Sequence, residues 1–339
     1  MVKRDLMKKL GSMQQVAYIR KVRFEEGRAG NMKAIEVKNG PISYTMMEDK
    51  CLDICQLTYN GIGLNFLSKP GLQGRCHYDT NGQEAQRSIM GGLMFTCGTD
   101  NVGVPNEVDG TAYPMHGRLR STPAEHVCAD SYWDGDEYKI VASGEMRQSM
   151  LFGENIVLRR TIETHLGSNI IHIHDEVENQ AYIDTPLMFL YHCNIGYPLL
   201  DENSKIIIPA SKSFLKGNEK KETQEEWNKV TEPVDNLPEQ VFYHELSSDE
   251  ENKTHVAIIN EELELGIMLR FNKEQLPCFA QWKSMASGDY VIGLEPSNCH
   301  VEGRGAEKKR KTLRMLAPFE KVNFDLEIVI LDKKKNIWI

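Results

Sequence analysis

The chain has 339 residues, of which 40% are hydrophobic, and can bury a large core in one big all-β domain or in two smaller domains. Its net charge of −9, from 49 acidic and 40 basic residues, argues against a nucleic-acid or anionic-membrane partner, since both require clustered cations. A small neutral ligand suits this balance.

The sequence shows neither a secretion signal nor a membrane span. Residues 1–20 contain early lysines but lack the apolar stretch of a signal peptide. The longest apolar runs, such as Ile206–Ile208 and Ile328–Leu331, are far too short to cross a bilayer. We therefore expect a cytoplasmic protein. Eight cysteines are scattered without a Cys-x-x-Cys pair, which is typical of reduced, mostly buried thiols.

The N-terminal part begins with one helical pattern and continues with strand patterns. The pattern over Lys3–Leu10 predicts a helix that ends at Gly11. Alternating residues predict a strand around Ile35–Val37 and a second strand over Ile42–Leu57. The pairs Asn39-Gly40 and Asn60-Gly61 predict turns after them.

The rest of the chain is also rich in strands. Asn155–Asn179 predicts a long hairpin, and Val322, Phe324, Leu326, Ile328 and Ile330 repeat at period two. The polar stretch Lys216–Glu239 is interpreted as a surface excursion, with a short helix over Glu219–Asn228.

These patterns predict the fold class. Strands do not alternate with helices, so a parallel doubly wound sheet is disfavoured. We expect an all-β protein with large antiparallel sheets packed face to face and few short helices. No internal repeat or long linker divides the chain. The expected organisation is a single domain over residues 1–339, with residues 1–30 as a helical or extended lead-in.

Four segments concentrate glycine and polar residues next to strand-like runs. They are Gly91–Gly103, Met115–Arg118, Leu190–Pro198 and Gly293–Asn298. Loops on a rigid sheet often carry binding and catalytic groups. Taken singly, the first segment is equally compatible with a β-bulge, and a lone histidine is more often a structural hydrogen-bonding residue than a catalyst.

The most informative residue in these segments is Glu295, which follows a buried run of Val291, Ile292 and Leu294. A carboxylate at the end of a buried strand is costly to leave unpaired. It therefore either meets an arginine or acts as a base whose pKa is tuned by its surroundings. Trp282 adds an aromatic face of the kind on which sugars stack.

Two patterns suggest other functions. His172, His174 and Glu176 share one face of a strand and could ligate a transition metal. The opposite face is apolar, so a solvated histidine face is the better interpretation. The basic run Lys308–Lys311 could suggest nucleic acid, but in so acidic a chain a solvated loop is favoured.

Together the segments resemble the aldose 1-epimerase-like family that carries the domain of unknown function 4432, which is related to galactose mutarotase. The resemblance extends from near Gln14 to the last strand. The matching stretches are Glu48–Ile54, Thr96–Gly98, Asn101–Gly103, His116–Arg118, Tyr191–Pro198, Gln281–Lys283 and Gly293–Asn298.

The resemblance implies a galactose mutarotase-like β-supersandwich with the sugar in an open cleft across one sheet. Galactose mutarotases use two histidines, a glutamate base and an aspartate. His116 and His192 match the two histidines, and Glu295 matches the glutamate. The aspartate has no match in its motif, although Asp53 and Asp100 are available.

One departure from the family pattern occurs at Lys50-Cys51, where this group usually has arginine and glycine. Lysine keeps the charge but cannot form a bidentate fork, which puts a ligand contact from this position in doubt.

We therefore expect an isomerase that interconverts the anomers of a free sugar by acid–base ring opening and closure, without a cofactor or metal. Glu295 is the expected base, His192 the acid, and His116 a hydrogen-bonding group for the sugar. The residues expected to bind the sugar are Arg118, Asn194, Trp282, Lys283, Arg304, Asp53 and Asn101. The expected partner is a small-molecule sugar, with no nucleic acid and no membrane, and an exposed sheet edge could pair in a homodimer.

Three alternatives stay open. A carbohydrate-binding protein without catalysis would need the gripping residues but not the acid–base pair. An epimerase of a phosphorylated sugar would need several basic groups aimed at the phosphate. A metal-dependent sugar isomerase would use His172, His174 and Glu176.

Overall fold

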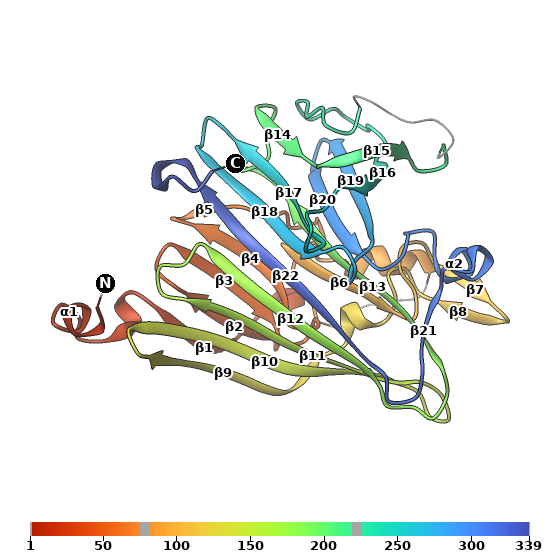
Figure 1. The fold of residues 1–339 in the computed structure, drawn as a ribbon, viewed down its shortest axis with the longest axis horizontal. Coiled ribbons are helices and arrows are strands. Elements are labelled where there is room, and N and C mark those ends of the chain that lie inside the picture. Colours follow the sequence, from red (N-terminus) through yellow and green to blue (C-terminus); the bar gives the residue numbers. More distant parts are fainter. Residues whose placement is uncertain (1, 75–81, 219–225, 339) are drawn as a thin grey trace.

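The computed structural model describes residues 2–74, 82–218 and 226–338. Strands dominate this part of the chain and form three antiparallel sheets and a two-stranded ribbon (Figure 1). The helices are short. They are α1 (Lys3–Met7), α2 (Arg304–Arg310) and 3-10 turns at Met13–Gln15, Gly27–Ala29, Gly82–Ser88, Leu119–Ser121 and Lys333–Lys335.

The largest sheet has eight strands in the order β14-β17-β18-β22-β12-β11-β10-β9. Its strands are β9 (Ala124–Asp134), β10 (Glu137–Ser149), β11 (Asn155–His165), β12 (Ile170–Asn179), β14 (Ser204–Ile207), β17 (Lys253–Asn260), β18 (Leu265–Asn272) and β22 (Lys321–Asp332). In β12, Ile171 and Ile173 are buried while His172 and His174 are exposed. This period of two places one face of the sheet on the core and the other in solvent.

The second sheet has seven strands, in the order β15-β16-β19-β20-β13-β21, with β6 also paired to β13. Its strands are β6 (Met94–Thr99), β13 (Thr185–Ile195), β15 (Ala210–Leu215), β16 (Gln240–Leu246), β19 (Cys278–Ala286), β20 (Asp289–Ser297) and β21 (Arg314–Leu316). Every residue of β13 is buried, so this strand is covered on both faces.

A five-stranded sheet is formed by the N-terminal part of the chain. Its strands are β1 (Tyr18–Arg23), β2 (Lys33–Lys38), β3 (Ile42–Met47), β4 (Asp53–Tyr59) and β5 (Ile62–Gly63). The ribbon pairs β7 (Asn106–Val108) with β8 (Thr111–Tyr113).

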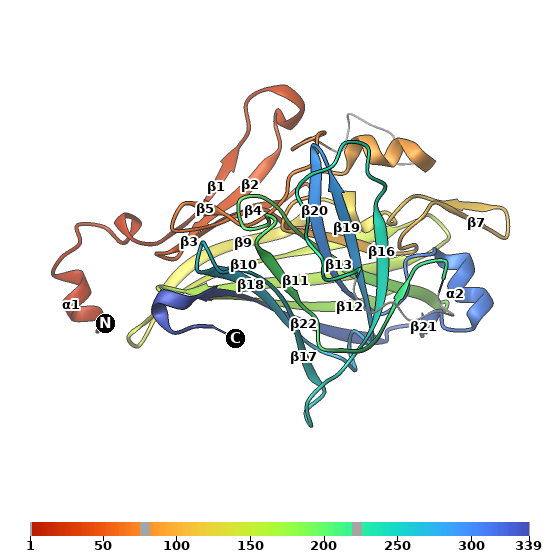
Figure 2. The same ribbon diagram turned by 90° about the horizontal axis from the view of Figure 1, so that it is seen from above.

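The core lies between the eight-stranded and seven-stranded sheets. Figure 2 shows strands of the seven-stranded sheet on one side of the eight-stranded sheet. Phe189 of β13 stacks on Phe324 of β22 with 4.7 Å between ring centroids, and the hydroxyl of Tyr191 donates to Asp175 of β12. Odd-numbered side chains of this part of β13 therefore point to the eight-stranded sheet.

A buried arginine joins all three sheets. Arg160 of β11 donates to Asp53 of β4, to Asp175 of β12 and to the hydroxyl of Thr96 in β6, over 2.7–2.9 Å. Arg160, Asp53 and Asp175 are fully buried, and the one guanidinium is paired with both carboxylates. Removing one partner of such a network leaves a buried charge uncompensated.

The structure confirms the predicted strands and turns with one change. The hairpin over Asn155–Asn179 is β11 and β12, and the C-terminal strand is β22. The single strand predicted over Ile42–Leu57 is wrong, because the chain turns after Met47 and forms β3 and β4. Leu52 in this turn has a positive φ of 54°, which no extended strand allows.

The N-terminal helix ends at Met7, earlier than Leu10. The helix predicted over Glu219–Asn228 lies mostly outside the described residues, and residues 226–228 form a bend. Within the described ranges, no helix has the length and apolarity needed to cross a bilayer. The seven cysteines that lie in the described residues are free thiols, of which Cys51, Cys55, Cys97, Cys193 and Cys299 are buried.

Candidate active site

A cavity of about 630 Å³ opens over the face of the seven-stranded sheet that points away from the eight-stranded sheet. Because side chains alternate along a strand, His192 and Asn194 of β13 face this cavity while Tyr191 faces the core. Phe95 of β6 lies opposite His192 in the register and lines the same cavity.

The floor of the cavity holds a histidine–carboxylate pair. His192 on β13 and Glu295 on β20 lie between the register pairs Leu190–Ser297 and Cys193–Leu294. Nε2 of His192 lies 3.1 Å from Oε1 of Glu295, and both side chains are buried. The antiparallel register thus brings together two residues that are 103 positions apart in the sequence.

Glycine at position 293 leaves room for this pair. A Cβ added to Gly293 would lie 3.0 Å from Oε1 of Glu295, 3.0 Å from Cε1 of His192 and 3.2 Å from Cβ of Trp282. These distances are tighter than ordinary van der Waals contacts, so any side chain here would displace the carboxylate or the imidazole.

His116 reaches the same cavity from a loop. Its backbone has a φ of 58°, its N–H donates to the carbonyl of Gly103 and its carbonyl accepts from the N–H of Gly98. The next residue must be glycine, because a Cβ on Gly117 would lie 2.3 Å from the carbonyl oxygen of Gly98. The His116 ring is held 5.6 Å from the His192 ring, centroid to centroid.

Burial controls the protonation of the floor. It raises the pKa of the Glu295 carboxyl to about 8, an effect that Lys216 reduces and Glu239 reinforces. It lowers the pKa of the His192 imidazole to about 4. At neutral pH the 3.1 Å contact therefore holds one shared proton, on the carboxyl or on Nε2 of the imidazole.

His116 is neutral for a related reason. Burial lowers its pKa well below the ordinary value, and the nearby charges of His192, Arg120 and Lys216 lower it further. Its Nδ1 is buried without a hydrogen-bond partner among the described residues, as are Nδ1 of His192 and Oδ1 of Asn194. Unsatisfied polar atoms around a cavity are ready to bind a polar ligand.

The side wall combines an aromatic face with two opposite charges. The ring of Trp282 lies 5.4 Å from that of His192, and its Nε1 donates to Oε2 of Glu239 over 2.6 Å. Lys216 and Glu239 stand at the two ends of the segment that links β15 to β16, and both line the cavity. Sequence reasoning missed both residues, because it assigned the whole segment to a surface excursion.

The structure brings His116, His192, Glu295, Asn194 and Trp282 together around the cavity. Asn194 also supports the floor, since its Nδ2 donates to the carbonyls of Gly92 and His192.

The other five predicted binding residues are engaged elsewhere and do not line the described cavity. Asp53 belongs to the Arg160 network, and the Nζ of Lys283 donates to the carbonyl of Glu226. Arg118 forms an ion pair with Asp100.

Asn101 and Arg304 support the loop that carries His116. Nδ2 of Asn101 donates to the carbonyls of Val104 and Pro114, and its Oδ1 accepts from the backbone N–H of Arg304. These bonds fix the loop that carries His116. The Arg304 guanidinium lies over the Tyr113 ring, 4.4 Å from its centroid.

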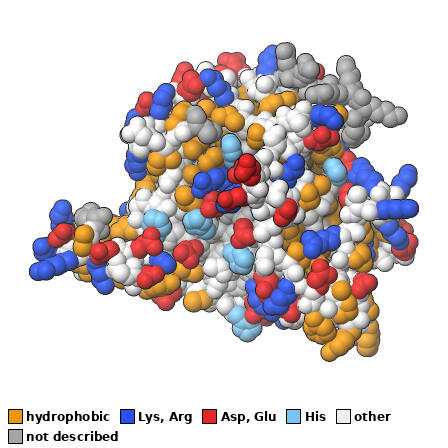
Figure 3. All heavy atoms as spheres, viewed as in Figure 1, with side chains coloured by type: hydrophobic (Ala, Val, Ile, Leu, Met, Phe, Trp, Pro, Cys, Tyr) orange, Lys and Arg blue, Asp and Glu red, His pale blue; other side chains and the backbone are white. Residues whose placement is uncertain are grey.

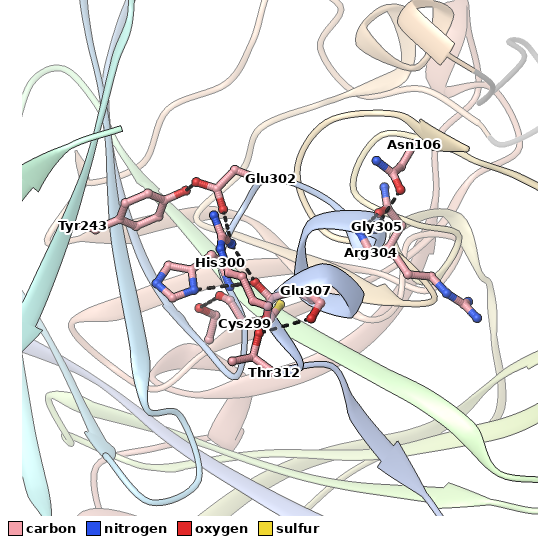
Figure 4. Close-up of polar contacts among 12 residues, drawn as sticks. Asn106, Tyr243, Cys299, His300, Glu302, Arg304, Gly305, Glu307 and Thr312 are labelled. Atoms are coloured by element: carbon pink, nitrogen blue, oxygen red, sulfur yellow. Dashed lines mark hydrogen bonds and ion pairs between the residues drawn. The ribbon is translucent and has the colours of Figure 1, made fainter. Parts of the chain in front are cut away.

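Figure 4 shows the polar network beside α2, with the Arg304 side chain pointing away from it. Glu302 accepts from the hydroxyl of Tyr243, and the buried carboxylate of Glu307 accepts from Thr312 and from the backbone N–H of His300. This network anchors Val301, which lines the cavity. The charged residues of the network therefore support the cavity wall and do not line it.

His172, His174 and Glu176 lie on the outer face of the eight-stranded sheet, far from the cavity in the fold. Figure 3 shows histidine, acidic and basic side chains mixed on this face. Nδ1 of His174 contacts Asp325 over 2.7 Å, and Glu176 forms ion pairs with Arg159 and Lys321. In the described part of the chain, no group of three or more His, Cys, Asp or Glu side chains is arranged to hold a metal ion.

Solved structures share this architecture. A candidate aldose 1-epimerase from Klebsiella pneumoniae superimposes with a TM-score of 0.85 at 22% identity, over 94% of this chain and 88% of that chain. A galactose mutarotase-like protein from Clostridium acetobutylicum gives 0.63 at 12% identity, over 94% and 99%. A candidate mutarotase from Salmonella typhimurium gives 0.58 at 12% identity, over 96% and 99%. At these identities the likeness establishes a galactose mutarotase-like fold.

Sequence comparison is more specific about the family. No curated protein matches the chain. Residues 29–330 match the family described as a domain of unknown function, DUF4432. The match covers most of the chain, which therefore belongs to the DUF4432 family.

Proposed function

We propose that the protein is an aldose 1-epimerase that interconverts the anomers of a free, neutral sugar. The observation that carries this proposal is the buried pair of His192 and Glu295, whose Nε2 and Oε1 atoms lie 3.1 Å apart at the floor of the cavity. The hydroxyl and the ring oxygen of a hemiacetal are bonded to the same carbon. A base and an acid that act on both oxygens must therefore lie close together.

The shared proton of the pair supplies both catalytic groups. When it lies on Nε2, Glu295 is a carboxylate that accepts the proton of the anomeric hydroxyl, and His192 is an imidazolium that donates its proton to the ring oxygen. The bond between the anomeric carbon and the ring oxygen breaks, and an aldehyde forms. After rotation about the adjacent carbon–carbon bond, His192 takes the proton back from the chain hydroxyl as it attacks the other face of the aldehyde, and Glu295 returns its proton to the aldehyde oxygen.

Neutral His116 would hold the sugar in this geometry. Its ring lies 5.6 Å from that of His192, and its buried Nδ1 has no partner in the described residues. A hydrogen bond to a sugar hydroxyl would satisfy it, which favours binding because an unsatisfied buried group is destabilising. The unsatisfied Oδ1 of Asn194 would accept from a second hydroxyl.

The side wall favours a neutral sugar over a phosphorylated one. Trp282 offers an aromatic face for the C–H face of a sugar, and its indole is fixed by Glu239. Lys216 and Glu239 carry opposite charges, and Lys69 at the wall is paired with Asp289 over 2.5 Å. A phosphate would meet carboxylates as well as ammonium groups here, whereas sugar hydroxyls can pair with both.

Polarimetry on freshly dissolved single anomers tests the proposal. A panel of neutral aldoses and ketoses, together with sugar phosphates, is followed with and without protein. We expect accelerated mutarotation of at least one neutral sugar, reduced about 100-fold or more in His192→Asn. The matched control is Lys283→Met, a neighbouring residue on the opposite face of β19, which should keep most of the rate. Saturable sugar binding without acceleration would instead support a carbohydrate-binding protein without catalysis.

A further inference from the structure

Large apolar side chains gather on three turns at one end of the molecule. This apolar tip patch comprises Met150–Phe152 between β10 and β11, Tyr182 and Ile183 between β12 and β13, and Met315 and Phe319 beside the turn from β21 to β22. Leu151, Phe152 and Tyr182 are 81%, 98% and 86% exposed. Figure 3 shows apolar side chains gathered at the lower right, where Figure 1 draws the turns that end these strands.

Hydrogen bonds fix the three turns relative to one another. The Nδ2 of Asn179 donates to the carbonyls of Ile183 and Leu316, and its carbonyl accepts from the N–H of Phe319. The N–H of Gln180 donates to the carbonyl of Asn155, which joins the second turn to the first. The apolar tip patch is therefore preorganised, and binding a partner through it would order little additional chain.

The backbone at two of these tips is unfavourable for the residue it carries. Phe152 and Phe319 have φ values of 61° and 63°, a left-handed conformation that suits glycine and asparagine and disfavours bulky residues. At other turns of this chain the same conformation is held by Asn60, Asn252 and Asn336. Phe319 packs edge-to-face on Tyr182, with 5.2 Å between the ring centroids. Phe152 is almost fully exposed and gains little inside the monomer, so a contact outside the monomer is the better physical account of this residue.

The size of the apolar tip patch fits a protein partner. Three exposed aromatic residues of about 150–250 Å² each, reduced by their exposed fractions, give about 350–600 Å². This already equals the largest apolar patch of a typical monomer, about 300–600 Å². The four aliphatic side chains extend it towards the roughly 800 Å² per partner that a standard interface buries.

The charges around the patch favour a second copy of the same chain. Positively and negatively charged side chains both occur there, as in the ion pair of Arg314 with Glu320 and in that of Arg147 with Glu125. Across a two-fold axis, the basic side chains of one copy can lie opposite the acidic side chains of the other. A net charge of −9 disfavours an anionic membrane surface as the occupant.

We propose that the apolar tip patch is the self-complementary interface of a homodimer. None of its residues lines the described cavity, so both cavities stay open in the dimer. The proposal therefore stands independently of the sugar chemistry.

Sedimentation velocity over a range of protein concentrations tests it. We expect a concentration-dependent dimer whose dissociation constant rises at least about tenfold in Phe152→Asn and in Tyr182→Ser. Asparagine suits the left-handed backbone at 152, so this variant should keep or raise its melting temperature while the dimer is lost. Weaker association with an intact fold cannot be explained by misfolding.

The control variant is Tyr132→Ser, which removes an exposed aromatic residue from the edge strand β9 of the eight-stranded sheet. It should leave the dimer intact. A wild type that stays monomeric at every concentration would overturn the proposal. So would a dimer that survives both patch variants but dissociates in Tyr132→Ser, because that outcome would assign the contact to the sheet edge.

Discussion

Replacement of Glu295 by glutamine should abolish activity and stabilise the protein at alkaline pH. Glutamine has nearly the same shape but cannot accept the hydroxyl proton. Loss of general acid–base help typically reduces turnover by about 100- to 10,000-fold. The same substitution removes a buried carboxyl whose pKa is raised from 4.5 to about 8 by burial.

The pH dependence of this effect follows from linkage. A carboxyl with a raised pKa in the folded state contributes stability that is present below about pH 4.5 and is lost as the pH rises to about 8. His192, with its pKa lowered from 6.5 to about 4, contributes stability that is present above about pH 6.5 and is lost as the pH falls to about 4. In the wild type, the changes of these two contributions with pH are opposite and cancel between about pH 4.5 and 6.5. Between about pH 6.5 and 8 only the carboxyl contribution changes, so the free energy of unfolding falls by about 2 kcal/mol, at about 1.4 kcal/mol per pKa unit.

Glutamine removes the carboxyl contribution alone. Between about pH 5 and about pH 9, Glu295→Gln should therefore gain on the order of 4 kcal/mol of unfolding free energy relative to the wild type. Urea unfolding at both pH values measures this difference. A variant that is equally destabilised at both pH values would refute the buried, protonated carboxyl and the shared-proton pair that depends on it.

The remaining predictions concern the pH profile, the cavity floor and the core. The rate should follow a bell-shaped pH profile with apparent pKa values near 4 and 8. Lys216→Met should raise the apparent pKa of the alkaline limb, and Glu239→Gln should lower it. Shifts of this pKa in the same direction in both variants would contradict the opposite effects of the two charges. Gly293→Ala should displace the side chains of His192 and Glu295 and lower turnover about tenfold, with little change in melting temperature. Full activity in this variant would show that the cavity floor can hold a methyl group without moving them. Arg160→Met should reduce the free energy of unfolding, measured by urea titration, by about 3–5 kcal/mol, because it leaves two buried carboxylates unpaired. A reduction of less than about 1 kcal/mol would contradict a buried charge network.

Local patterns predicted the strands well where one face is buried and the other is solvated. β12 and β22 follow this rule, and their alternation is visible in the sequence. β13 is buried on both faces, so its sequence shows no alternation between apolar and polar residues. The turn between β3 and β4 was missed because Cys51 and Leu52 adopt positive φ values without glycine or asparagine at those positions.

The candidate site was predictable where motif resemblance coincides with strand register. His192 and Glu295 occupy facing positions of neighbouring strands, and His116 precedes a glycine that its loop requires. Residues such as Lys283 were misplaced because adjacent positions of a strand face opposite sides, and sequence alone did not show which face carries the cavity.

Asp53 shows a second cause of error. It lies in a matching motif, but its carboxylate balances buried Arg160, and a long-range ion pair of this kind leaves no local signal. Lys216 and Glu239 were missed for the reverse reason, since charged residues at the ends of a polar segment resemble any solvated loop.

The most direct test of the central claim is proton NMR saturation transfer between the two anomeric protons of a neutral sugar at equilibrium. The sugar is the aldose that polarimetry selects, and protein is added at increasing concentration. We predict an exchange rate that rises in proportion to the concentration of the wild-type protein and stays at the buffer rate when Glu295→Gln is added instead. Broadened sugar resonances that demonstrate binding, with an exchange rate equal to that of buffer, would contradict this prediction.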